Sequence, residues 1–172
     1  MPTLFNADGL TVRTSAPSDV MAILEVYRQC EDFLSLGPVP VASLAMVNAD
    51  IRHAETTHGS FCVIEDKAGH AVGVLEFTVA ESERTAVLHL LMISLLHRKK
   101  GHGAAIFRAL ESHLRDTYSV QVIESGVQVN NPDAQRFWRR CGFEVDTVPK
   151  ERDDGTTAFD MKKVLRCDRQ GG

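Results

Sequence analysis

The pattern of apolar and polar positions in the first third of the chain predicts one strand and two helices. Residues 10–14 alternate between apolar and polar side chains, as a short strand does. Apolar residues then recur every three or four positions over residues 17–34, where Pro17 suits the first turn of a helix. A second pattern with this spacing covers residues 41–57 and ends at Gly59, so we expect two helices before the main strands.

The middle of the chain predicts a hairpin followed by a buried strand. Residues 60–65 and 71–80 have the composition of strands, and the turn between them contains Gly69, which suits a positive φ. Residues 85–94 are almost continuously apolar, as in a strand that is covered on both faces. We therefore expect an antiparallel hairpin beside a central strand.

The next part of the chain returns to helical spacing. Residues 103–118 carry one apolar face, which predicts an amphipathic helix, and residues 120–129 predict another strand. Asn131 suits the N-cap of a short helix, and Gly142 suits the position just after its last turn.

The last part of the chain predicts a closing hairpin over residues 143–148 and 158–164. Asp154 and Gly155 lie between these strands and form a dipeptide that is typical of tight turns. The mixed order of helices and strands predicts an α+β fold, in which a mixed, mostly antiparallel central sheet is flanked by helices.

The length and composition indicate a single domain. The chain has 172 residues, of which 44% are hydrophobic and 24% are charged, so it is long enough for one core and short for two. We expect one domain over residues 1–172, with its core over residues 10–165 and a flexible tail over residues 166–172.

Charge and cysteine content exclude several classes of protein. The formal net charge of −4 argues against general nucleic-acid binding, which usually requires a basic surface. The sequence shows neither a secretory leader nor an apolar stretch long enough for a bilayer, so we expect no membrane association. Scattered cysteines predict reduced thiols in a cytoplasmic protein without a metal site. These cysteines are Cys30, Cys62, Cys141 and Cys167.

The segment between the central strand and the next helix combines positive charge with glycine. Arg98, Lys99 and Lys100 precede Gly101 and Gly103, whose missing Cβ atoms let an anion approach the backbone N–H groups. The following helix directs its free N–H groups to the same point. Because three cations before a helix N-terminus oppose its dipole, a bound anion explains them better than a solvated surface does. The segment therefore predicts a phosphate-binding site.

Two common nucleotide motifs do not fit this segment. A Walker A loop requires Lys and then Ser or Thr after its last glycine, where this chain has Ala104 and Ala105. A dinucleotide fingerprint requires a third glycine, where this chain has Ile106, and a surrounding βαβ unit.

The spacing Arg98-x-x-Gly101-x-Gly103 resembles the acyl-coenzyme A motif of the GNAT superfamily of N-acetyltransferases. The apolar strand before the motif, and the helices and hairpin before that strand, are similar to those of the family. Residues 131–143, NPDAQRFWRRCGF, resemble the family's Asn-x-x-Ala-x-x-aromatic helix that ends in Gly-Phe. The resemblance spans about residues 10–165.

This resemblance implies a site for acetyl-CoA as co-substrate, without a metal. In the family, the central strand bulges and splays from the next strand, and the pantetheine arm bonds to its exposed backbone. The resemblance places that backbone at Leu91, Met92 and Ile93. It places the pyrophosphate on the N–H groups of residues 98–104, and the side chains of Asn131, Phe137 and Trp138 along the channel. The expected pyrophosphate contacts are Arg98, Lys99, Lys100, Gly101, His102, Gly103 and Ala104.

Attack of an amine on a thioester requires a base, a donor to the oxyanion and a thiolate that can leave. We expect His89 to be the base, on the strand face of Leu91 and Ile93, because an unperturbed imidazole pKa of about 6.5 suits this task. The backbone N–H near Ile93 is the expected oxyanion donor. A structural, mostly buried His89 is the alternative. The substitutes as base are Glu76, Glu81 and Glu124.

One position departs from the family pattern. Many relatives carry a Tyr, proposed to protonate the leaving thiolate, where this chain has Trp138, and an indole N–H is not a usable acid. We therefore assign Trp138 to binding. The thiolate either leaves unaided or takes a proton from water or another residue.

The acceptor is expected near the end of the first helix. Glu31 and Asp32 lie there, where carboxylates are unfavourable, and this region borders the acceptor site in the family. They predict a cationic acceptor for an N-acetyltransferase that acts on a primary amine of a small molecule or peptide. Two alternatives are a non-catalytic coenzyme A sensor and an acyltransferase for longer chains. Assembly as a homodimer is left open.

Overall fold

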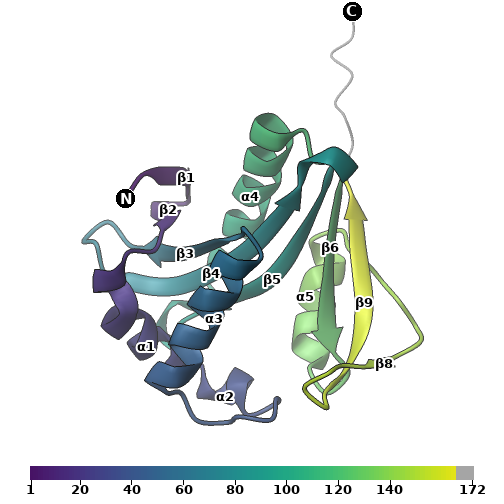
Figure 1. Ribbon diagram of the computed structural model, residues 1–172, viewed down its shortest axis with the longest axis horizontal. Helices are drawn as coiled ribbons and strands as arrows, with labels where there is room; N and C mark the ends of the chain where they lie inside the picture. The colour runs from purple at the N-terminus through teal and green to yellow at the C-terminus, as the bar shows by residue number, and fades with distance from the viewer. Residues whose placement is uncertain (166–172) are drawn as a thin grey trace, which may run out of the picture.

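The structure is a computed structural model that describes residues 1–165, with nine strands and five α-helices in that range (Figure 1). The strands are β1 (Thr3–Ala7), β2 (Leu10–Thr14), β3 (Ser60–Glu65), β4 (Ala71–Ala80), β5 (Thr85–Ile93), β6 (Val122–Gln128), β7 (Glu144–Val145), β8 (Lys150–Glu151) and β9 (Thr157–Val164). The helices are α1 (Val20–Arg28), α2 (Glu31–Leu34), α3 (Leu44–Thr56), α4 (His102–Tyr118) and α5 (Pro132–Arg140). Within these residues, no helix has the length and apolar character needed to cross a membrane.

All strands belong to one sheet in the order β1-β2-β3-β4-β5-β6-β9-β7, and β8 also pairs with β9. Neighbouring strands are antiparallel except for β5 and β6, which are parallel. The predicted α+β fold, with a mixed and mostly antiparallel sheet flanked by helices, is therefore confirmed.

The strands β5 and β6 pair over a short distance and then diverge (Figure 1). Their pairs join Thr85–Val87 to Val122–Glu124. Just beyond these pairs, the Ser125 hydroxyl donates a hydrogen bond of 2.6 Å to the Leu88 carbonyl and holds the two strands together. The predicted splay of the central strand is therefore confirmed, and it begins at this bond.

A β-bulge lies in β5 beside this point. Phe77 of β4 opposes Leu88, whereas Glu76 opposes Leu90, so His89 is an extra residue without an opposite partner in β4. A bulge increases local twist and bends its strand. The predicted bulge is confirmed, and it turns β5 away from β6.

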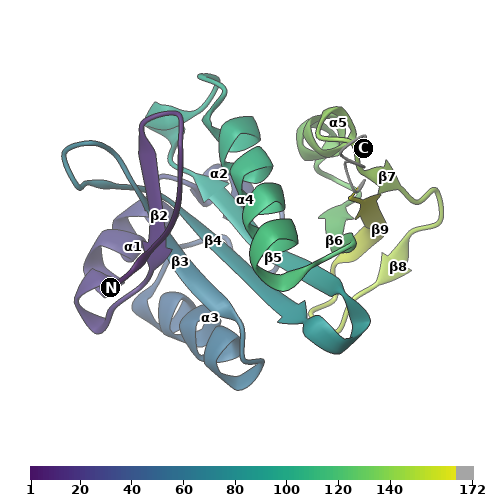
Figure 2. The ribbon, with the colours of Figure 1, turned by 90° about the horizontal axis from the view of Figure 1, so that it is seen from above.

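The helices cover the two faces of the sheet unequally (Figure 2). One face packs against α4 and α5 through residues that include Phe107, Leu110 and Trp138. The opposite face of β3, β4 and β5 packs against α1 and α3 through residues that include Ile23 and Val47. In the described part of the chain, no helix covers that face of β6, β9 and β7 (Figures 1 and 2). Part of the sheet is therefore open beside α3.

The N-terminal region differs from the prediction in two elements. The strand β1 was not predicted, although Asp8 and Gly9 join it to β2 with φ values of 51° and 76°, as in a two-residue hairpin turn. The single helix expected over residues 17–34 is divided into α1 and α2. The chain turns between them, because the N–H of Cys30 bonds back to the Tyr27 carbonyl at 2.9 Å.

Other boundaries differ less. The helix α3 begins at Leu44 rather than near residue 41, because the Ser43 hydroxyl accepts a bond from the Met46 N–H and caps the helix. The C-terminal hairpin turns where expected, but its first strand is β8, and β7 is a separate strand on the same partner, β9. The predicted tail, residues 166–172, lies outside the described residues.

Candidate functional site

The backbone of β5 is exposed along the gap beside β6. The N–H of Ser94, just after β5, donates a hydrogen bond of 2.8 Å to the carbonyl of Val72 in β4. Successive residues of a strand direct their backbone groups to alternate sides, so those of Leu91 and Ile93 point away from β4. They face the gap left by the divergence of β6. An extended molecule can bond to such a row of groups as an added strand would.

The segment after η3, a 3-10 helix at Leu95–His97, forms an open turn before α4. Lys99 and Gly101 have φ values of 59° and 81°, and no described atom lies within 4 Å of the place a Gly101 Cβ would take. The first helical bond of α4 joins the Ala105 N–H to the Gly101 carbonyl, so the N–H groups of residues 102–104 have no acceptor in the helix. No side chain among residues 1–165 caps this end. The turn therefore leaves three backbone N–H groups open to an anion. We call residues 98–104 the phosphate turn, after the ligand that the sequence predicts there.

The aromatic residues predicted on α5 have different surroundings. Phe137 lies against the start of α4, and its ring would be 3.3 Å from a Cβ on Gly103. Trp138 is 9% exposed and has edge-to-face contacts with the rings of Phe107 and Phe143. Trp138 is therefore a core residue, and its expected place along the channel stays a prediction. Phe137 is the aromatic residue of α5 that lies next to the phosphate turn.

The Asn131 side chain caps the N-terminus of α5. Its Oδ1 accepts a hydrogen bond of 3.1 Å from the Ala134 N–H, so the predicted N-cap is confirmed. The same bond engages the side-chain oxygen, and the expected place of Asn131 along the channel stays a prediction.

The Arg98 side chain is engaged within the protein. Its Nη1 and Nη2 donate to the Asp32 carboxylate at 2.5 and 3.1 Å, and its Nε donates to the Ile93 carbonyl at 2.8 Å. These bonds hold α2 against the end of β5. The hydrogen bonds from Arg98 also lower the pKa of Asp32. Lys99 and Lys100 are exposed at the phosphate turn, and the expected contact of Arg98 with the pyrophosphate stays a prediction.

The two carboxylates expected at the acceptor site also have partners within the protein. Asp32 binds Arg98, and Glu31 accepts a hydrogen bond of 3.0 Å from the Ala42 N–H. Neither residue is among the described residues that line the open cleft over β6 and β9. Local hydrogen bonds engage both carboxylates, and their expected contact with the acceptor stays a prediction.

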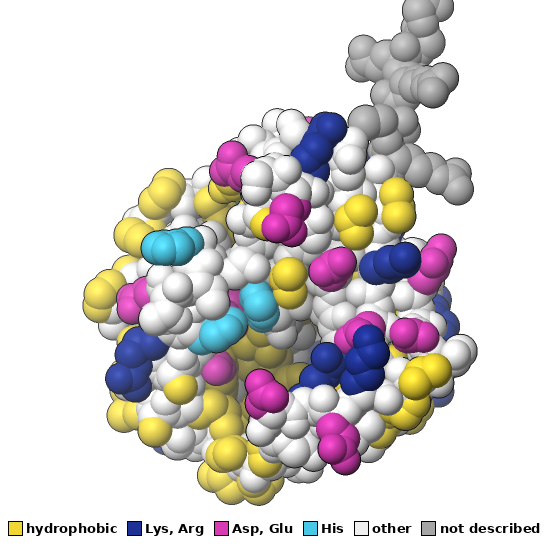
Figure 3. Space-filling model, turned by 45° about the vertical axis from the view of Figure 1, so that its right-hand side comes forward, with side chains coloured by type: hydrophobic (Ala, Val, Ile, Leu, Met, Phe, Trp, Pro, Cys, Tyr) yellow, Lys and Arg dark blue, Asp and Glu magenta, His cyan; other side chains and the backbone are white. Residues whose placement is uncertain are grey.

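An open cleft of about 1410 Å³ lies over the uncovered face of β6 and β9. Histidine side chains lie along one rim of this hollow, and acidic and basic side chains lie along the other (Figure 3). Leu88, His89 and Ser125 line the cleft at the point where β5 and β6 separate. The cleft therefore meets the gap that exposes the backbone of β5.

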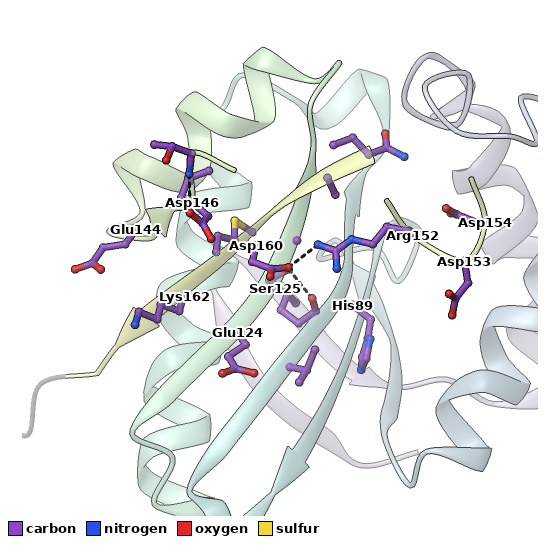
Figure 4. A pocket seen from close by; sticks show the side chains of 18 of the residues that line it. His89, Glu124, Ser125, Glu144, Asp146, Arg152, Asp153, Asp154, Asp160 and Lys162 are labelled. Atoms are coloured by element: carbon purple, nitrogen blue, oxygen red, sulfur yellow. Dashed lines mark hydrogen bonds and ion pairs between the residues drawn. The ribbon is translucent and has the colours of Figure 1, made fainter. Parts of the chain in front are cut away.

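Carboxylates outnumber cations in the cleft. Arg152 extends from the β8–β9 turn to Asp160, which it binds at 2.6 Å (Figure 4). Lys150 also binds Asp160. An excess of negative charge in a cleft raises the local concentration of cations. The lining carboxylates are Glu124, Glu144, Asp146, Asp153, Asp154 and Asp160, and the lining cations are Arg152 and Lys162.

Two histidines and a buried carboxylate meet beside the bulge. The Nδ1 of His53 is 2.6 Å from Oε1 of Glu76, and the rings of His53 and His89 are in edge-to-face contact at 5.0 Å. The Nε2 of His89 is 3.1 Å from the Thr78 hydroxyl. Burial lowers the pKa of His89, and the nearby charge of His53 lowers it further.

His89 lies on the face of the sheet opposite to the expected one. Leu91 and Ile93 pack into the core beneath α4, whereas His89 contacts His53 of α3. The bulge is the cause, because the extra residue shifts the alternation of side chains by one position.

A second carboxylate lies behind this pair. The Tyr27 hydroxyl donates a hydrogen bond of 2.6 Å to Asp50 of α3. Burial raises the pKa of both Asp50 and Glu76, and the hydrogen bond from His53 partly opposes the shift at Glu76. We call Tyr27, Asp50, His53, Glu76 and His89 the histidine–carboxylate cluster.

Sequence reasoning missed His53. It lies on the polar side of a correctly predicted helix, where histidine carries no distinctive pattern. Its partner Glu76 is 23 positions further along the chain, on another element. A pair at that separation becomes visible when α3 is packed on the sheet.

Comparison with known proteins identifies similar sequences and folds. The sequence matches the Acetyltransferase (GNAT) family over residues 22–143. Spermidine N-acetyltransferase from Vibrio cholerae, solved with CoA and spermine, is 19% identical, with 91% of this chain and 95% of that chain covered and a TM-score of 0.72. RimL, a ribosomal L7/L12 alpha-N-protein acetyltransferase solved with CoA, is 15% identical, with 95% and 98% covered and a TM-score of 0.77. A search of curated proteins gave no match.

Proposed function

The chain belongs to the GNAT family of acetyltransferases, and on that premise we propose that it transfers an acetyl group from acetyl-CoA to a primary amine of a small molecule or peptide. One observation carries the proposal. The gap between β5 and β6 joins the open turn before α4 to the cleft, and free backbone groups line the path between them. This path suits a long co-substrate with phosphates at one end and a thioester at the other.

In this proposal the N–H groups of residues 102–104 bind the pyrophosphate, with Lys99 and Lys100 beside them. The backbone groups of Leu91, which also point into the gap, bind the pantetheine arm. The Ile93 carbonyl already accepts the Arg98 bond, so its N–H is the group left for the thioester oxygen. A backbone N–H at that point would stabilise the oxyanion that forms during attack.

The amine is proposed to enter through the cleft. The excess of carboxylates there favours an acceptor that arrives as a cation, and such an acceptor must lose a proton before it attacks. The two proton-handling groups expected from the sequence, His89 and Glu76, both belong to the histidine–carboxylate cluster at the end of the gap. By their names, the two structural neighbours act on spermidine and on a ribosomal protein, so polyamines and peptide N-termini both belong in a first acceptor panel.

Two linked measurements test the function. Acetyl-CoA at about 100 times its Kd should stabilise the protein by about 2.7 kcal/mol in a thermal-shift assay, whereas ATP, which has phosphates but no pantetheine arm, should do much less. Thiol release should then depend on an amine from a panel of polyamines, amino acids, aminoglycosides and peptides. No shift with acetyl-CoA would overturn the cofactor assignment. A shift without thiol release on any acceptor would favour a coenzyme A sensor.

A further inference from the structure

Glu76 has no direct access to the cleft. It is 4% exposed, and it is not among the described residues that line the cleft. His53 does line the cleft, and its side chain is 49% exposed while its Nδ1 is 2.6 Å from the Glu76 carboxylate. His53 therefore lies between the buried carboxylate and the space proposed for the amine.

The bond to Glu76 decides which nitrogen of His53 carries the hydrogen. When Glu76 is ionised it can only accept hydrogen bonds, so Nδ1 is then the donor and the lone pair of the neutral ring is on Nε2. The same carboxylate stabilises the positive charge that appears when Nε2 takes a proton. His53 is thus held in the tautomer that a base requires.

His89 does not have this support. Its Nε2 bonds to the Thr78 hydroxyl, and no carboxylate among residues 1–165 bonds its ring. Burial and the charge of His53 lower the pKa of His89, so it holds a proton less firmly than an exposed histidine. The titratable groups around His53 are Asp50 on α3, Tyr27 on α1, Glu76 on β4 and His89 on β5.

We propose that His53 takes the proton from the ammonium group of the acceptor, and that Glu76 is the positioning residue that holds His53. The inference rests on the proposed function and assigns the base within the same site. His89 then borders the amine as a hydrogen-bonding neighbour and does not receive its proton.

In the proposed step, every bond that forms is matched by one that breaks. One N–H bond of the ammonium breaks, and its proton forms a bond to Nε2 of His53. The freed lone pair of the amine forms a bond to the acetyl carbon, and the carbon–sulfur bond breaks with its electron pair on sulfur. The nitrogen then loses a second proton, which ends on the thiolate as coenzyme A, and His53 returns the first proton to solvent.

Steady-state kinetics across pH test this assignment. Because general-base catalysis contributes about 10²–10⁴ in rate, His53→Gln should lower kcat by at least about 100-fold and remove the rise of kcat with pH, while KM for acetyl-CoA stays the same. His89→Gln should lower kcat less and keep the rise. Glu76→Gln should keep part of the rate, because His53 remains but is no longer held by a carboxylate. His70→Gln, at an exposed histidine that also pairs with an aspartate, is the matched control and should behave as the wild type.

A second readout does not depend on turnover. Nitrogen-15 NMR of the free protein should show His53 with its hydrogen on Nδ1, and Glu76→Gln should remove this preference. Folding of each variant is checked by its thermal shift with coenzyme A. Wild-type turnover that survives His53→Gln, or a His53 hydrogen on Nε2, overturns this inference alone. Absence of wild-type turnover on every acceptor overturns the proposed function and this inference with it.

Discussion

Gly101 and Gly69 have the same backbone conformation in different places. Both have a φ of 81°, and in both cases no described atom lies within 4 Å of the place a Cβ would take. A side chain at either position is strained, because L residues rarely adopt positive φ. Gly101 precedes α4 at the phosphate turn, whereas Gly69 lies in the turn between β3 and β4. Substituting each glycine in turn therefore separates the effect of backbone strain on stability from the effect of a side chain on ligand binding.

We expect Gly101→Ala and Gly69→Ala each to lower the free energy of unfolding by about 1 kcal/mol. Gly101→Ala should in addition raise the Kd for coenzyme A about tenfold or more, which corresponds to about 1.4 kcal/mol, because its methyl group enters the space of the phosphate. Titration calorimetry and denaturant unfolding on both variants measure the two effects. Equal Kd values for the two variants would argue against a phosphate at this turn.

Single residues show why the backbone part of the site was easier to predict than the side-chain part. The sequence predicts the turn at Gly101, because glycine readily adopts the positive φ that such a turn requires. It does not predict that Arg98 binds Asp32 across 66 positions, or that His89 is the extra residue of a bulge. Charged side chains find partners that only tertiary packing brings near, and one inserted residue reverses every later side chain on a strand.

At the scale of elements, periodicity predicts long helices and central strands well. The helix α4 and the hairpin of β3 and β4 appear where their spacing indicates, because each buries a regular apolar face. The short elements were missed or misplaced. The strands β7 and β8 each have two residues and are held by pairing with β9, so their own sequence carries little signal. The division between α1 and α2 falls at Cys30, whose thiol also donates a long hydrogen bond to the Ile93 carbonyl at the end of β5.

The different surroundings of α2 and β6 predict different roles for their carboxylates. Asp32 on α2 is paired with Arg98, whereas Glu124 on β6 lines the cleft. For a cationic acceptor, Glu124→Gln should raise the acceptor KM about two- to fivefold, since an exposed ion pair contributes up to about 1 kcal/mol. Asp32→Asn should leave that KM unchanged. Acceptor titrations at low and high salt measure this, because screening should reduce the effect of Glu124→Gln. An effect of Asp32→Asn with none of Glu124→Gln would restore the expectation from the sequence.

At the scale of the whole molecule, the cleft results from unequal coverage of the sheet. The helices α1 and α3 cover one face of β3, β4 and β5 and leave that face of β6 and β9 open (Figures 1 and 2). The histidine–carboxylate cluster lies at this boundary, so the same packing that buries Glu76 brings His53 to the edge of the cleft. The sequence could not reveal this arrangement, because the position of β9 between β6 and β7 is set by long-range pairing.

The N-terminal hairpin is joined to the rest of the molecule partly through a histidine. The ring of Phe5 on β1 lies 5.4 Å from the ring of His113 on α4, and the ring of Tyr118 lies 5.7 Å from that of His113. The Nε2 of His113 is buried without a hydrogen-bond partner among the described residues. Burial lowers the pKa of His113, and Asp116 partly opposes this shift.

The lowered pKa of His113 predicts how the stability of the protein changes with pH. Below about pH 6.5 the unfolded chain takes up a proton on His113, whereas the folded protein resists that proton, so stability is lost as the pH falls through this range. His113→Phe keeps an aromatic ring against Phe5 and removes the titration, so its melting temperature should fall less between pH 8 and pH 5.5 than that of the wild type. The same comparison with His70→Gln, at an exposed site, should show the wild-type fall. The other buried titratable groups are the same in both proteins. An equal fall in the melting temperature of His113→Phe would therefore mean that His113 takes up its proton at no cost to the folded protein, which would contradict the prediction.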